Sequence, residues 1–229
     1  MPIDQILIIG LIALASIATP MLIKAFGKGR QQAADILGLQ LDEKITAPPD
    51  PNRPDEVPLM TGHLHGLPAT VFVSVTNRRV GVNVGRERNT IGQAKTHLAL
   101  ALPHPSPLTL TISPILNATL YREPAPTDPV VPTNDTTFDQ AFLLSSNNPE
   151  TALNLIDAPF RQQLIDLRRS LLPSAPNNAV GHATASLLMG RLTLEPDRLR
   201  YTLRGTPNAK IANHLQAASM LMAQLIKKL

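Results

Sequence analysis

The apolar positions of this chain follow three patterns in turn, and each pattern predicts a different kind of element. An uncharged run from Ile6 to Ile23 comes first, and as a helix it would span roughly 27 Å. Residues 59–112 then alternate apolar and polar side chains, which is typical of half-buried strands. Beyond residue 149 a helical period predominates, interrupted by one more hairpin. This order predicts a membrane anchor followed by an α+β domain.

We interpret the first run as the retained single-pass anchor of a bacterial inner-membrane protein. Its apolar surface would come from Ile6, Leu11, Leu14, Ile17, Leu22 and Ile23. Lys24, Lys28 and Arg30 follow the run, whereas the charge before it is negative. Because positive residues stay on the cytoplasmic side, we expect the N-terminus outside and the remaining chain in the cytoplasm. The alternatives are a buried core helix and a cleaved signal peptide, which needs a basic start and a later A-x-A site.

Proline and glycine divide the chain into four parts. The anchor and its basic flank take residues 1–28, and a juxtamembrane helix that stops near Gly38 lies within residues 29–45. Residues 46–58 contain five prolines and predict a stiff, extended spacer. Residues 59–229 remain for the soluble domain, which is long enough to bury a substantial core.

Within the soluble domain the alternating patterns predict an antiparallel sheet, because one strand face is apolar and the other polar. Strands are expected over residues 59–65, 69–75, 80–84, 96–102 and 108–112, and in a hairpin over residues 192–203. Helices are expected over residues 149–157 and 159–172, capped by Asn148 and Asp157 respectively. The mixture of sheet and helices predicts the α+β fold class.

The last expected helix starts at Pro207 behind a Thr206 cap and has the most regular apolar seam. Our first interpretation is that this seam packs on the domain's own sheet. The alternative is a face for a partner helix or the membrane, which Lys227 and Lys228 near its end favour. The contacts of that alternative face would be Ile211, Leu215, Met222 and Leu225.

The composition says little about the fold, but it excludes several classes of site and partner. The absence of Cys excludes disulfides and thiolate metal sites. The net charge of +4 and pI near 9.7 favour anionic partners. Only 3% of the residues are aromatic, which argues against nucleic acid, because single-strand binding needs stacking platforms.

The sequence contains no motif for nucleotide binding, nucleophilic catalysis or a zinc protease, so we assign no catalytic residue and no cofactor. His63 and His65 are weak metal candidates. On a strand they would share a face, with His97 or His104 as the third ligand. The alternative interpretation places both on the solvated face of a hairpin that ends at Gly66.

A basic cluster lies around two expected turns. It consists of Arg78, Arg79, Arg86, Arg88 and Lys95. Beside a membrane this cluster would contact anionic headgroups or an acidic partner protein, and the remaining interpretation is a solvated rim. We therefore group it with Lys24, Lys28 and Arg30 as candidate partner or lipid contacts.

A series of short phrases spans most of the chain. They are Leu37-Gly38-Leu39, Gly62 with Gly66, Phe138-Asp139 with Phe142, and Leu171-Leu172. In this order they resemble a broad group of uncharacterised bacterial proteins with an N-terminal membrane anchor and a cytoplasmic α+β domain. The resemblance implies that fold and no known activity. The phrase Phe138-Asp139 with Phe142 itself predicts a structural corner, with two buried rings and a carboxylate that caps backbone groups.

These observations predict a non-catalytic accessory or scaffolding subunit of a larger bacterial membrane complex, with energy-converting complexes among the natural hosts. A membrane-surface domain that binds lipid or another ligand is the first alternative, and an unrecognised enzyme is the second. We expect other membrane subunits and anionic headgroups as partners, and no nucleic acid.

Overall fold

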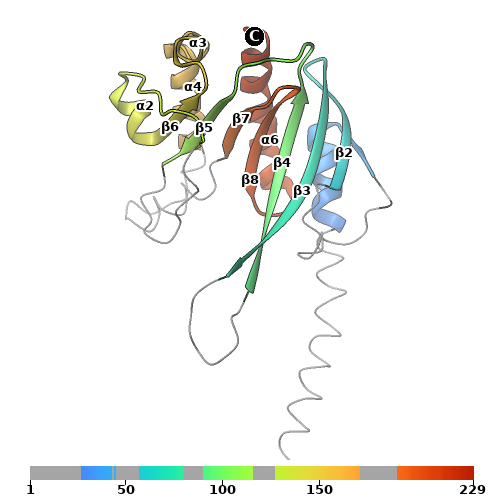
Figure 1. Ribbon diagram of the computed structural model, residues 1–229. Helices are drawn as coiled ribbons and strands as arrows, with labels where there is room; N and C mark the ends of the chain where they lie inside the picture. The colour runs from blue at the N-terminus through green and yellow to red at the C-terminus, as the bar shows by residue number, and fades with distance from the viewer. Residues whose placement is uncertain (1–26, 43, 45–56, 80–89, 116–126, 171–189) are drawn as a thin grey trace, which may run out of the picture.

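An eight-stranded antiparallel sheet forms the centre of this protein, with strands in the order β1-β2-β3-β4-β8-β7-β5-β6 (Figure 1). The computed structural model describes residues 27–42, 44, 57–79, 90–115, 127–170 and 190–229. The antiparallel sheet and the helices packed against it confirm the expected α+β fold. Within the described residues, no helix has the length and apolar character needed to cross a membrane. The expected anchor over residues 6–23 lies outside them.

The strands agree closely with the alternating patterns of the sequence. They are β1 (Gln40–Leu41), β2 (Val57–Leu64), β3 (Leu67–Arg79), β4 (Thr90–Ala101), β5 (Leu110–Pro114), β6 (Phe142–Ser146), β7 (Arg191–Leu194) and β8 (Arg198–Arg204). The β2–β3 and β7–β8 hairpins are confirmed, whereas the strand expected over residues 80–84 lies outside the described residues. Two strands are not predicted by the sequence: β1, which is very short, and β6, whose residues do not alternate.

Helices lie before, between and after these strands. They cover residues 27–37, α2 (Thr136–Ala141), α3 (Pro149–Leu155), α4 (Ala158–Ser170) and α6 (Ala209–Ile226). The predicted caps of α3 and α4 are confirmed, because Asn148 accepts a hydrogen bond from the Thr151 amide and Asp157 from the Phe160 amide. The predicted Thr206 cap is wrong. Asn208 caps α6 instead, and its side chain accepts from the Ile211 amide at 3.0 Å.

The helix over residues 27–37 ends at a glycine, as the sequence predicts. Gly38 has φ +65°, and the amides of Gly38 and Leu39 donate to the carbonyls of Asp35 and Ala34. This pair of bonds satisfies the last carbonyls of the helix. Ala34 and Leu39 are buried in the same core as the sheet. The helix thus packs into the core of the domain.

The core lies on one face of the sheet. Helix α6 crosses β4 and β8 on this face, and Figure 1 shows the helix over residues 27–37 on the same side. Leu215, Met222 and Leu225 of α6 are at most 1% exposed, and Ile211 packs against the same core. These side chains are occupied by the chain's own core, which confirms the first interpretation of the apolar seam. They are not presented to a partner helix.

A buried polar pair links α6 to β8. The Tyr201 hydroxyl lies 2.7 Å from Nε2 of His214 and accepts a hydrogen bond from the Gly190 amide. Because that hydroxyl oxygen is already an acceptor, we assign its own proton to the bond with His214. Burial lowers the pKa of His214 to about 4, so the ring is neutral at pH 7. The pair satisfies two polar side chains inside the core.

The predicted corner at the edge of the sheet is also confirmed. The rings of Phe138 and Phe142 are buried and stack with their centroids 5.1 Å apart. The Asp139 carboxylate accepts hydrogen bonds from the amide and the hydroxyl of Thr133. Asp135 caps α2 and also forms an ion pair with Arg161 of α4. The contacts of this corner hold α2 and α4 against the β6 edge of the sheet.

Candidate functional site

The face of the sheet opposite the core is the candidate site. We call it the open face, because no described helix or strand packs across its central strands. It is formed by alternate residues of β3, β4, β8 and β7: Thr70, Phe72, Ser74, Lys95, His97, Ala99, Arg198, Arg200, Thr202, Arg204, Arg191 and Thr193. Strand geometry explains the set, because alternate residues of a strand point to opposite faces.

Cations predominate on the open face. In β8, arginines 198, 200 and 204 alternate with the core residues Leu199, Tyr201 and Leu203. Lys95 of β4 lies directly opposite Arg204 in the register. Arg191 of β7 lies opposite Thr202. These pairings bring cations from three neighbouring strands onto one surface.

Two carboxylates lie at the β7–β8 turn and partly balance this charge. Glu195 forms ion pairs with Arg200 at 2.7 Å and with Arg198 at 3.1 Å. Asp197 forms a second ion pair with Arg198 at 3.2 Å. Both carboxylates therefore lie at one end of the open face. Lys95 and Arg204 lie at the opposite end of the β4–β8 pairing.

An aromatic stack forms the middle of the open face. The Phe72 ring lies on the His97 ring with centroids 4.7 Å apart and planes within 12°. The Arg200 guanidinium lies 5.3 Å from the centroid of the Phe72 ring, within the range of a cation–π contact. Both His97 nitrogens are engaged, Nε2 with the Ser74 hydroxyl at 2.7 Å and Nδ1 with the Thr202 hydroxyl at 2.9 Å.

The environment of His97 fixes its charge. Burial is the main cause that lowers the pKa of His97 to about 4, and the nearby cations Arg200 and Lys95 act in the same direction. His97 is therefore neutral at pH 7. Its ring holds neighbouring strands together and carries no charge of its own.

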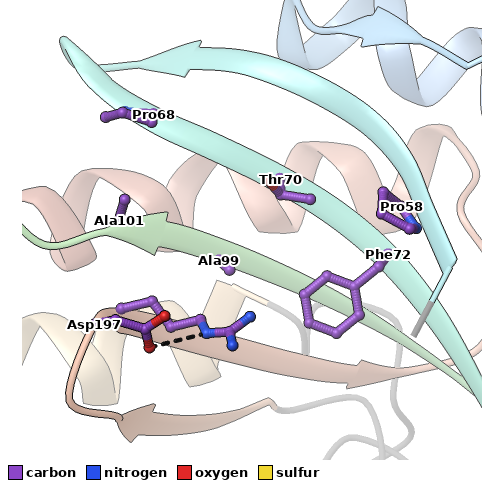
Figure 2. A pocket seen from close by; sticks show the side chains of 8 residues that line it. Pro58, Pro68, Thr70, Phe72, Ala99, Ala101 and Asp197 are labelled. Carbon is purple, nitrogen blue, oxygen red and sulfur yellow. Dashed lines mark hydrogen bonds and ion pairs between the residues drawn. The ribbon is translucent and has the colours of Figure 1, made fainter. Parts of the chain in front are cut away.

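The open face is hollowed in two places. The basic depression, of about 310 Å³, is lined by Lys95, His97, Pro114, Arg191, Thr193, Glu195, Arg200, Thr202, Leu203 and Arg204. The second depression, of about 260 Å³, has Phe72 and Pro58 at one end and Asp197 at the other (Figure 2). Among the described residues that line the basic depression, four are cations and one is a carboxylate.

Among the described residues there are two serine–histidine contacts, and neither forms an activated nucleophile. The Ser219 hydroxyl donates to the Gln216 carbonyl at 2.7 Å, so its contact with His65 is as an acceptor. Next to Ser74, His97 has a low pKa and is oriented by a threonine instead of a carboxylate. A histidine of that pKa is a weak general base at neutral pH.

The structure separates the two histidines that were weak metal candidates. His63 lies on β2 opposite Pro68, whereas His65 lies in the following turn with φ +54° and contacts Ser219 of α6. The expectation that they share a strand face is wrong, because the strand ends at Leu64. Within the described part of the chain, no three His, Asp or Glu side chains are grouped to hold a metal ion.

Of the predicted basic contacts, only some lie in the described residues. Lys28 is exposed on the first helix, but Arg30 is only 8% exposed and is therefore not presented to headgroups. Arg78 and Arg79 lie at the end of β3, opposite Ile91 and Thr90 of β4.

Other predicted contacts fall outside the described residues. They are Ile6, Leu11, Leu14, Ile17, Leu22, Ile23, Lys24, Arg86 and Arg88.

The arginines of β7 and β8 are not among the site residues that the sequence predicts. Their hairpin is predicted, but its polar face is not placed beside Lys95. The signal was the arginine at alternate positions of RLRYTLR, which puts several cations on one strand face.

Comparisons with known proteins add little to this geometry. No family model matches the chain, and no curated protein matches it either. A solved structure of similar fold is the crystal structure of the mycobacterial trehalose monomycolate transport factor A, TtfA. The two share 11% sequence identity at a TM-score of 0.49, over 88% of this chain and 93% of that one. A likeness of this degree carries no argument about function.

Proposed function

We propose that this protein is a non-catalytic, membrane-tethered accessory subunit whose open face docks on an acidic surface of a partner protein. The tether is the apolar run over residues 6–23, and the partner belongs to a larger membrane complex. The observation that carries the proposal is the one-sided sheet, which has helices on its core face and clustered cations on its open face.

Arginine is the main cation of the open face, and its chemistry favours carboxylates. A guanidinium binds a carboxylate through two parallel hydrogen bonds and is more weakly hydrated than an ammonium. Complementary charge also speeds the encounter of two proteins and fixes their orientation. An acidic protein surface therefore fits this face better than a neutral one.

The shape of the face favours a protein over a bilayer. The Arg200 side chain lines the basic depression and is only 19% exposed. A bilayer surface is flat on this scale and would reach the rim first, whereas a protein side chain can enter the hollow. The lipid-binding alternative would gain roughly 1 kcal/mol from each cation near an anionic surface.

Co-extraction with matched charge variants tests the docking proposal. Thr70→Glu with Thr111→Glu adds two carboxylates to this side of the sheet: Thr70 belongs to the open face, and Thr111 of β5 lies opposite its Thr193. Both threonines are half-buried. Gln163→Glu with Gln216→Glu adds the same charge to exposed positions of α4 and α6. Each tagged full chain is extracted from its native membrane in mild detergent, and the proteins that travel with it are quantified.

We expect the wild type and the helix variant to retain the same membrane proteins in fixed ratio. The open-face variant should retain at least about tenfold less, because like charges across an interface cost several kcal/mol. Urea unfolding of the three proteins checks that all are folded. Equal retention by the two variants, or no partner with any chain, would contradict the proposal.

A further inference from the structure

Strands β3 and β4 continue together past the end of the sheet and form a two-stranded arm (Figure 1). Within the described part of the chain, β2 pairs with β3 only as far as Val73, and β8 pairs with β4 only from Lys95 onward. Beyond these points β3 and β4 still pair with each other. We call residues 76–79 and 90–93 the arm.

The first helix, over residues 27–37, begins at the root of this arm. A side-chain carbon on Gly29 would lie 2.8 Å from the carbonyl oxygen of Pro207, so glycine allows the helix to approach the β8–α6 connection closely. In the same connection, the Gly205 amide donates a hydrogen bond to the Ala94 carbonyl, just before the arm. The start of the helix and the root of the arm therefore lie at the same end of the sheet.

The other end of the first helix lies toward the opposite end of the sheet. Leu39, just after the helix, packs against Gly62 of β2, and Gly62 pairs with Ala69 of β3. Ala69 in turn lies opposite Leu100, near the end of β4. The helix therefore runs along the strands, and its first residues are directed toward the arm.

We infer that the arm lies in the headgroup layer of the membrane that holds the tether. This placement rests on the tether of the proposed function, whose apolar run ends at Ile23. Residues 24–26 join Ile23 to Gly27, and a fully extended chain of this length spans at most about 14 Å. The arm extends about 13 Å from Ala94 to Thr90. Because both lengths start from the same end of the sheet, the end of the arm reaches the bilayer surface.

The backbone of the arm determines how deep it lies. Among the described residues no strand pairs with either outer edge of the arm, so its outward amides and carbonyls need water or headgroups as partners. Hydrocarbon offers them none. Thr76, Asn77 and Gln93 are polar, and Arg78 and Arg79 stand at the end of β3, where anionic headgroups attract cations. The arm therefore lies among the headgroups and not in the hydrocarbon core.

This placement also orients the docking surface. Strands β3, β4 and β8 run toward the membrane, so the open face that they form is turned to the side. A partner that docks there stands beside this domain on the same membrane surface. Its acidic surface would belong to a neighbouring domain close to the bilayer.

Fluorescence quenching by a spin-labelled lipid tests the inference on the full chain. The chain contains no cysteine, so one introduced cysteine carries one dye. Asn77→Cys and Gln93→Cys label the two strands of the arm, and His104→Cys labels the opposite end of β4 as the matched control. Lys28→Cys labels the exposed start of the first helix and reports the tether. Each chain is reconstituted in vesicles of phosphatidylglycerol and phosphatidylcholine, with a nitroxide on some of the phosphatidylcholine headgroups.

We expect strong quenching at residues 28, 77 and 93, and a several-fold smaller loss of fluorescence at residue 104. Quenching falls steeply with distance, and β4 alone holds residues 93 and 101 about 26 Å apart. Urea unfolding of each labelled chain checks that it is folded, and the two arm positions guard against a local disturbance at one of them.

The failing results separate the arm from the tether. Quenching at residue 28 without quenching at residues 77 and 93 would overturn the inference and leave the tether standing. No quenching at any position would contradict the tether as well. Equal quenching at residues 93 and 104 would show that the domain lies flat on the membrane, which also overturns the inference. Docking on a partner protein is measured separately, by the proteins that travel with the chain.

Discussion

Acidification from pH 7 to pH 5 is expected to lower the free energy of unfolding by about 2 kcal/mol for each of His97 and His214. Burial is the main cause of the low pKa of both rings, about 4 in the folded chain. In the unfolded chain a histidine titrates near 6.5. Between these two values the unfolded state binds more protons than the folded state.

The direction of the effect follows from that difference. A state that binds more protons is favoured as the pH falls, so stability is lost between pH 6.5 and pH 4 and is fully present above pH 6.5. The loss from both histidines, about 4 kcal/mol at pH 5, is a large part of the 5–15 kcal/mol typical of a domain. Most carboxylates stay ionised at pH 5, so they contribute little in this window.

Urea unfolding at pH 7, 6 and 5 measures the effect. His97→Gln and His214→Gln should each flatten the pH dependence, because glutamine does not titrate. His104→Gln changes an exposed histidine and serves as the control. If all three variants kept the pH dependence of unfolding that the wild type has, the assignment of neutral His97 and His214 would be contradicted.

Replacement of Phe138 by alanine is expected to lower the free energy of unfolding by about 3–5 kcal/mol. Phe138 is fully buried, and its ring stacks on Phe142. The substitution removes the whole ring and leaves a cavity under α2, next to the hydrogen bonds between Asp139 and Thr133. The ion pair between Asp135 at the α2 cap and Arg161 of α4 opposes closure of the two helices over that cavity.

Phe138→Leu is the matched control, because it keeps an apolar side chain and most of the volume. We expect it to cost clearly less than Phe138→Ala in urea unfolding. An alanine variant as stable as the leucine variant would show that the corner does not support the fold.

The features that the sequence predicted correctly depend on neighbours in the chain. The Phe138–Phe142 corner and the caps by Asn148 and Asp157 each join residues within one helical turn. The end of the first helix at Gly38 is equally local. Such features can be read from spacing, because secondary structure alone brings the groups together.

The features that the sequence did not predict depend on the order of the strands. His97 contacts Thr202 across a separation of 105 residues, and β4 pairs with β8 rather than with β5. The charge of the open face follows from that pairing, because it places Lys95 beside Arg204. The alternation of residues along a strand shows which side chains share a face. It does not show which other strands lie beside that strand in the sheet.

Site-specific cross-linking in living cells tests the central claim, that the open face docks on a partner protein. A photoreactive amino acid replaces Thr193 on the open face or, as the control, Gln163 on the exposed side of α4. Illumination before extraction records contacts in the intact membrane. We predict a discrete protein adduct from position 193 and none from position 163. An adduct from position 163 alone, or from neither position, would contradict the account.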